Sequence, residues 1–242
     1  MKGGSVDATV NLDAEGTANC YIVPTPGKYR FKADVKGSSN VSLDGTATYA
    51  EVIWESFGTD IAPSVGDIIK SVRIEDGSVF FETPDALQNG NALIAVKDNS
   101  GTILWSWHIW VCDGYNPIVT AQTYANNAGI MMDRNIGALS ATPGSDLSSG
   151  LLYQWGRKDP FMASSSLSNP ALAKTTPDMP TPVSGPQSIE YTIQHPDTVI
   201  SFGSFEWDSS ANESRWDEVK TIYDPCPARL GIRQLGRVAG PM

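Results

Sequence analysis

The sequence predicts a mostly β protein whose second half is α+β, and three observations support this fold class. Charged residues make up only 18% of the 242 residues, while small turn-forming residues are plentiful. Such residues favour short strands joined by loops over long helices. Apolar and polar residues alternate in the first half, and an Asp-Gly dipeptide separates two β-prone runs. Alternation and Asp-Gly turns are typical of antiparallel strands.

Ordered structure is expected to begin near Ala18. Residues 1–17 are small and polar, which predicts a linker or a loose first strand. Residues 20–23 are β-prone, and a turn from Pro24 to Gly27 follows. Apolar Tyr, Phe, Ala and Val then alternate with charged residues over 28–35, which predicts a half-buried strand.

Two hairpins follow in the first half. Residues 68–75 and 78–83 flank Asp76-Gly77, the residue types that a type I′ turn requires. Residues 92–97 and 102–112 flank a second turn at 98–101. About six strands without intervening helical patterns predict an antiparallel β-sandwich domain over residues 18–113.

The second half has weaker patterns. Short apolar segments occur at 130–132 and 151–156, and short strands are expected at 199–207 and 221–223. Five prolines lie between Ser164 and Pro186, which predicts a long surface excursion there.

Charge and hydropathy exclude several functions. The formal net charge is −10, so a nucleic acid partner is not expected. No run approaches the roughly 18 apolar residues that cross a bilayer. The first residues also lack a signal-peptide core, so an exported protein would have lost its leader or would be a fragment.

Catalytic and metal-binding motifs are missing. The sequence has no nucleotide-binding, zinc-protease or hydrolase motif, and His108 and His195 are its two histidines. We therefore expect no catalytic residue, no metal site and no cofactor. The segment Arg157-Lys158-Asp159 is interpreted as a local ion pair or turn. A carboxylate-based glycoside hydrolase remains an alternative, with Glu206, Asp208 and Asp217 as its acids.

The segment 105–110 is the most unusual in the chain. On a strand, Trp105 and Trp107 share a core face, whereas His108, Trp110 and Cys112 share the other. The second face suits either contact with the second domain, the favoured interpretation, or a platform for sugar rings. The candidate ligand-binding residues are Trp105, His108, Trp110 and Trp155.

Three cysteines allow one disulfide and leave one thiol over, with Cys20 and Cys112 as the candidate pair. Catalysis by cysteine is disfavoured, because Cys112 and His108 lie four residues apart on one predicted strand. That spacing separates them by roughly 13 Å, too far for proton transfer.

Motifs in both halves resemble known bacterial surface proteins. The segments 18–23, 27–29, 54–55, 90–92 and 105–110 resemble the repeat unit of fimbrillin-like surface proteins of Bacteroides-type bacteria. The segments 131–138, 150–161 and 223–227 resemble the major paralogous domain first named from Fibrobacter succinogenes. Together the two resemblances cover about residues 17–228.

The resemblance implies an exported, often lipid-anchored protein with a C-type-lectin-like second domain over 114–228. It also implies an adhesive role at the cell surface, with glycans or other surface proteins as partners and no established catalytic residues. A structural pilus or surface-layer component is the alternative. The family continues with Gly-Trp-Arg after Cys226-Pro227, whereas this chain has Ala228-Arg229-Leu230. We therefore expect a truncated second domain and a poorly docked tail over 229–242.

Overall fold

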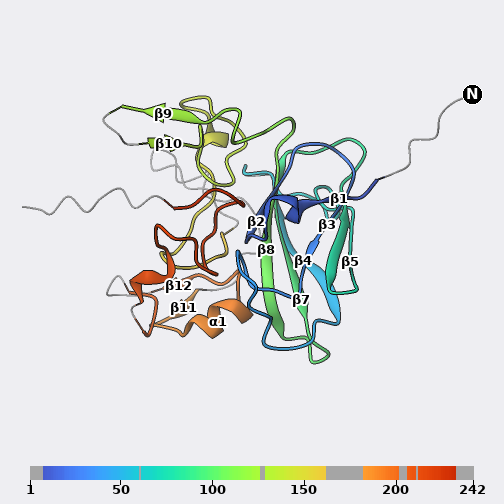
Figure 1. Ribbon diagram of the computed structural model, residues 1–242, viewed down its shortest axis with the longest axis vertical. Helices are drawn as coiled ribbons and strands as arrows, with labels where there is room; N and C mark the ends of the chain where they lie inside the picture. Colours follow the sequence, from blue (N-terminus) through green and yellow to red (C-terminus); the bar gives the residue numbers. More distant parts are fainter. Residues whose placement is uncertain are drawn as a thin grey trace, which may run out of the picture.

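The computed structural model describes residues 8–59, 61–125, 129–161, 182–201, 206–210 and 212–232. The protein is mostly β with few helices (Figure 1). The strands are β1 (Val10–Asn11), β2 (Cys20–Val23), β3 (Lys28–Lys32), β4 (Tyr49–Ser56), β5 (Ser71–Glu75), β6 (Ser78–Glu82), β7 (Gly90–Lys97), β8 (Ile103–Val111), β9 (Gln122–Tyr124), β10 (Gly129–Met131), β11 (Val183–Ser184) and β12 (Ile200–Ser201). The helical elements are the short 3-10 turns η1 (Leu12–Glu15), η2 (Asp146–Ser148) and η4 (Glu213–Arg215) and the helix α1 (Ile189–Gln194).

Two four-stranded sheets form the first half. Their strand orders are β1-β3-β6-β5 and β2-β8-β7-β4. The main core lies between them, where the rings of Phe31 and Trp107 are 5.0 Å apart. The alternation on β3 explains this packing, because Tyr29 and Phe31 are buried while the intervening charged residues are not. Burial of large aromatic and aliphatic side chains is the main stabilisation of this half.

Both predicted hairpins are confirmed. β5 and β6 pair in register around Asp76 and Gly77, which both have positive φ values, 48° and 69°. This is the backbone of a type I′ turn, and it explains the Asp-Gly dipeptide. β7 and β8 pair over most of their length in the second hairpin.

The two sheets are not purely antiparallel, contrary to the expectation. β1 pairs with β3 in parallel, and β2 pairs with β8 in parallel, with Cys20 opposite His108. A parallel pair needs a long crossover between its strands. The chain between β2 and β8 contains five strands and supplies that crossover.

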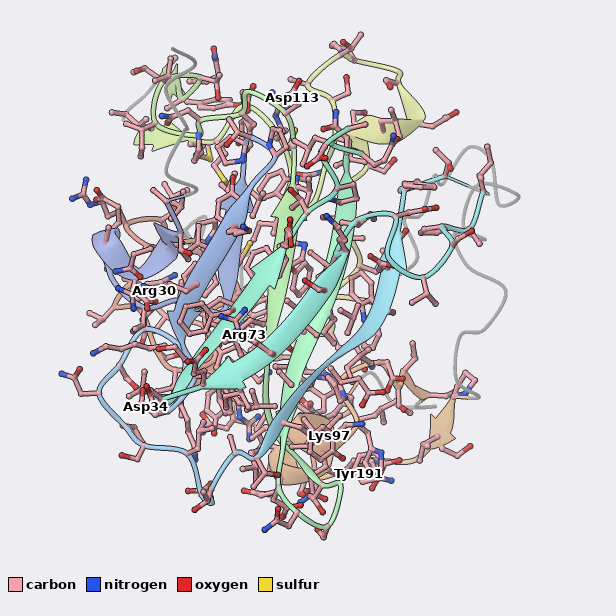
Figure 2. All side chains as sticks on the ribbon, turned by 90° about the vertical axis from the view of Figure 1, so that its right-hand side faces the viewer. Arg30, Asp34, Arg73, Lys97, Asp113 and Tyr191 are labelled. Atoms are coloured by element: carbon pink, nitrogen blue, oxygen red, sulfur yellow. The ribbon has the colours of Figure 1, made fainter. Side chains whose placement is uncertain are left out.

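The outer side of the β1-β3-β6-β5 sheet is polar. Arg30, Phe80 and Arg73 lie opposite one another on β3, β6 and β5. Figure 2 views this face and labels Arg30 and Arg73 on it, and the Arg73 guanidinium lies 4.5 Å from the Phe80 ring. No apolar stripe is present on this side of the three strands, so the core lies on their inner side.

The second half lies beside β8, on the side away from the first sheet. Figure 1 shows β9 and β10 at one end, and β11, β12 and α1 at the other. The Ser106 hydroxyl on β8 donates to the Asp159 carboxylate at 2.9 Å, and the Asn91 amide on β7 donates to the Gly137 carbonyl at 3.0 Å. These contacts bury the second face of the sheet, so β8 is enclosed on both faces from Trp105 onward.

Several expectations for the second half were wrong or lie outside the described residues. Residues 221–223 form a turn, since the Asp224 backbone N–H donates to the Thr221 carbonyl. Of the expected strand at 199–207, the structure describes β12, while residues 202–205 lie outside the described residues. Most of the predicted proline-rich excursion, at 164–181, and the end of the predicted tail, at 233–242, lie outside the described residues. The domain boundary near Asp113-Gly114 stays a prediction.

Candidate ligand-binding site

Three of the four predicted ligand-binding residues are inaccessible. Trp105, His108 and Trp110 are 0%, 1% and 0% exposed. Trp105 lies in the main core, whereas His108 and Trp110 lie on the side of β8 that the second half covers. A sugar ring therefore finds no free ring face on any of them. Trp110 lies beneath the second half, in agreement with the favoured interpretation. It packs near Met132, Ile136 and Leu139.

His108 links the sheet to the second half. Its Nε2 atom lies 2.8 Å from the Asn91 Oδ1 atom, and the same Asn91 side chain reaches the Gly137 carbonyl. Burial lowers the pKa of His108 to about 3, because no solvent stabilises the charged ring. The imidazole is therefore neutral at physiological pH and serves as part of a buried polar connection.

The predicted disulfide between Cys20 and Cys112 does not fit the structure, which holds all three cysteines buried and in the reduced form. Strand register gives the reason. Cys20 lies opposite His108, and Cys112 lies four residues further along the neighbouring strand. At the rise of a strand this places the two residues roughly 13 Å apart along the sheet. A disulfide needs Cα atoms about 4.4–6.8 Å apart.

Trp155 is the predicted ligand-binding residue that reaches the surface. It is 50% exposed, and its ring lies 4.9 Å from the ring of Trp216 at an interplanar angle of 59°. The buried Trp207 donates its indole N–H to the Trp155 carbonyl at 2.6 Å. An indole so supported presents one rigid apolar face to solvent at little cost in conformational entropy.

The backbone beside Trp155 is shaped by Gly156. Its φ of 82° lies in the left-handed region that favours glycine. A Cβ at Gly156 would approach the Arg215 Cβ to 3.4 Å. The turn at Trp155-Gly156 therefore packs directly on Arg215 while the Trp155 ring stays outside.

A buried ion pair supports this surface from below. Arg215 pairs with Asp208, and both side chains are almost fully buried. Burial alone would raise the pKa of Asp208, but the hydrogen bonds from Arg215, Ser210 and Asn212 outweigh it and lower the pKa to about 2. Asp208 therefore remains ionised and holds the loop that carries Trp207.

The sequence did not indicate that Arg157-Lys158-Asp159 connects the second half to β8. The Lys158 ammonium donates to the Ser106 hydroxyl at 2.6 Å and to the Asp159 carboxylate at 2.6 Å, so the segment binds β8 rather than only itself. Burial lowers the pKa of Lys158 to about 8, although Asp159 opposes this. Ser106 between two tryptophans on a strand was the signal in the sequence, because a buried hydroxyl needs a partner.

Ser106 and Lys158 have the spacing of a Ser-Lys catalytic pair but not its environment. Ser106 is 0% exposed in the middle of β8, and Lys158 is held by the Asp159 carboxylate. A nucleophile needs a path for substrate and a neutral base. The hydrogen bond between Ser106 and Lys158 therefore connects the second half to β8 and does not provide an accessible nucleophile.

Arg157 is anchored to backbone oxygens. Its guanidinium donates to the carbonyls of Thr198, His195 and Pro196 at 2.8, 3.2 and 3.2 Å. Burial lowers the pKa of Arg157 to about 10. This residue thus joins the segment after Trp155 to the segment after α1.

Among the residues that the structure describes, no group of three or more His, Cys, Asp or Glu side chains could hold a metal ion. Nor does any helix in the described ranges have the length and apolar character needed to cross a membrane. No family model, no curated protein and no solved structure matches this chain.

Proposed function

We propose that this chain is a non-catalytic binding module of the bacterial cell surface, and that a glycan ring stacks on Trp155. The proposal includes the fimbrillin-like and major-paralogous-domain family, export from the cell, and the finer fold. That fold is a β-sandwich followed by a C-type-lectin-like domain. The motifs in both halves and the mostly β architecture support it.

The observation that carries the proposal is the exposed Trp155 ring on its rigid support. Ring-bearing ligands such as sugars bind well to an aromatic face that does not have to be ordered first. Trp216 at 4.9 Å and the hydrogen bond from Trp207 fix the position of the platform before any ligand arrives.

A glycan array with Trp155→Ala tests this function. We expect the wild-type chain to bind a subset of glycans and Trp155→Ala to lose roughly fivefold or more in affinity, since stacking is worth about 1 kcal/mol or more. Tyr49→Ala is the matched control, because Tyr49 is a 41% exposed aromatic on β4 and should leave binding unchanged. Absence of binding at high concentration, or equal binding by Trp155→Ala, would contradict the proposal.

A structural role in a surface assembly is the second candidate, and an apolar surface favours it. Ile118 and Val119 are 60% and 79% exposed, and both line a pocket of ≈ 440 Å³ beside the edge strand β2. Exposed apolar residues at a sheet edge suit contact with another chain. Sedimentation velocity should then show self-association that Ile118→Asp abolishes.

The glycoside hydrolase alternative has less support. A general acid must carry a proton at the working pH, whereas Asp208 is ionised and bound to Arg215. Glu206 is engaged as an acceptor for the Asp208 backbone N–H at 3.0 Å. Hydrolysis of a polysaccharide that Asp217→Asn or Glu206→Gln abolishes would restore this alternative.

A further inference from the structure

The segment that precedes Pro227 lies directly beside β2. The Asn19 amide donates to the carbonyls of Ile222 and Asp224 at 2.7 and 2.9 Å. One residue further along, Cys20 forms an isolated parallel bridge with Pro227. These contacts place residues more than 200 positions apart side by side at the edge of the sheet.

The same segment is fixed around Cys226. The Lys220 ammonium donates to the Cys226 carbonyl at 2.8 Å and to the Asp224 carboxylate at 2.7 Å. The Cys226 backbone N–H donates to the same carboxylate at 2.7 Å. Cys226 therefore has a defined position against β2, and its side chain is buried, as is that of Cys20.

The bridge sets the separation of the two cysteines. Cys20 and Pro227 are direct partners, and Cys226 precedes Pro227 by one residue. Adjacent strands lie about 4.8 Å apart and one residue adds about 3.3 Å along the strand, which gives a Cα separation of about 6 Å. This lies within the Cα range of about 4.4–6.8 Å found in disulfides. On a regular strand Cys226 would face the other side of the sheet, but its segment meets β2 at a single bridge. Cys20 and Cys226 also both raise the pKa of the buried Tyr153 hydroxyl, so the two thiols lie near the same buried group.

We propose that Cys20 and Cys226 form the disulfide of this chain and that Cys112 is the thiol left over. The bond fastens the segment before Pro227 to β2 and closes a loop of 226 − 20 = 206 residues of sequence separation. Closing so long a loop strongly restricts the unfolded chain. This inference is independent of the proposed ligand-binding function.

The surroundings of the thiols determine when the bond forms. Burial raises the pKa of Cys20 well above its usual value, and the neighbouring Cys226 raises it further. Burial and the adjacent Asp224 also raise the pKa of Cys226. Thiolates attack disulfides and thiols do not, so the folded chain reacts slowly and the bond forms during folding.

The chemistry balances with an organic disulfide as oxidant. One cysteine thiolate attacks glutathione disulfide and releases one glutathione thiolate. The second cysteine then attacks the mixed disulfide and releases the other. The two cysteines lose two electrons and two protons, and glutathione disulfide gains them as two glutathione molecules.

Refolding of the full chain tests the pairing. The reduced, unfolded protein is refolded in a buffer of reduced and oxidised glutathione, alkylated, digested without reductant and mapped by mass spectrometry. We expect a peptide that joins Cys20 to Cys226, in large excess over any other pair, with Cys112 alkylated. A Cys112-containing bond as the main product, or alkylation of all three cysteines, would overturn the proposal.

Single variants separate the pairing from incidental oxidation. Cys112→Ser should keep the bond, whereas Cys20→Ser should lose it and leave Cys112 and Cys226 alkylated. A bond between Cys112 and Cys226 in Cys20→Ser, formed in the wild-type yield, would equally count against the assignment. The wild-type map does not depend on whether any variant folds.

Discussion

The two halves of the molecule are stabilised by different kinds of contact. In the first half, apolar side chains from two four-stranded sheets meet in one core. In the second half the described strands are two or three residues long, and buried charges hold the chain in place. The pairs Lys158–Asp159 and Arg215–Asp208 are both almost fully buried.

The stability of the two halves should therefore respond differently to substitution. An apolar core loses stability gradually as volume is removed, because neighbouring side chains relax. A buried ion pair fails abruptly when one partner is lost, because the remaining charge has neither water nor counter-charge. The position of Trp155 depends on the second kind of contact, since Arg215 packs on the adjacent Gly156.

The largest effect is expected from Lys158→Met. The substitution leaves the Asp159 carboxylate buried without its cation, and we expect the free energy of unfolding to fall by about 3–5 kcal/mol. Urea denaturation followed by circular dichroism measures it. The expected result follows from the desolvation of the unpaired carboxylate rather than from lost packing, since Met retains most of the Lys volume.

Two controls sharpen this prediction. Lys158→Met combined with Asp159→Leu removes both charges and should recover much of the loss. Lys70→Ala breaks the exposed Lys70–Glu82 pair and should cost less than about 1 kcal/mol. Equal losses from Lys158→Met and Lys70→Ala would show that burial does not distinguish the two pairs.

The connection between the halves should weaken in acid. The unfolded chain protonates His108 near pH 6.5, while the folded chain resists protonation until about pH 3. Unfolding therefore takes up a proton between these values, and stability falls as the pH decreases through this range. By pH 4 the loss from this residue should reach up to about 3 kcal/mol.

Comparison of variants isolates the contribution of His108. Denaturation of His108→Gln between pH 7 and pH 4 should show a shallower fall in stability than the wild type. His195→Gln serves as the control because His195 is exposed, and it should follow the wild-type curve. Parallel curves for His108→Gln and the wild type would show that His108 is not the group that titrates.

The sequence predicted much of the first half, because its signals are local. Alternation over β3 and the Asp76-Gly77 turn each depend on neighbouring residues, and both appear as expected. The two faces of β8 were also separated correctly, with Trp107 in the main core and Trp110 in a second cluster. The parallel pairing of β2 with β8 was missed, because it joins distant segments and carries no local pattern.

The candidate site was predicted only in part for the same physical reason. Trp155 is accessible and Trp105 lies in the main core, but burial of His108 and Trp110 depends on the second half, which has no periodicity to place it. The contact between Ser106 and Asp159 spans 53 residues, and that between Asn19 and Asp224 spans 205. Polar contacts at such separations follow from the folded arrangement, so the spacing of residues in the sequence could not indicate them. For the same reason it could not indicate Cys226 as the proposed partner of Cys20.

The smallest effect tests whether packing itself differs between the halves. Ile109 lies in the main core and Ile200 is equally buried on β12, so Ile109→Val and Ile200→Val remove the same methylene group from each half. We expect Ile109→Val to lower the free energy of unfolding by about 1 kcal/mol and Ile200→Val by about half as much, within the usual range for this change. The reason is that Ile109 is enclosed by large side chains from two sheets, whereas Ile200 is fixed mainly through its backbone. The Ile200 N–H donates to Gln154 Oε1 and the Ile200 carbonyl accepts from Gln154 Nε2.

Urea denaturation at pH 7 measures both variants. A larger loss for Ile200→Val than for Ile109→Val would mean that apolar packing contributes more to the stability of the second half than its buried charges suggest.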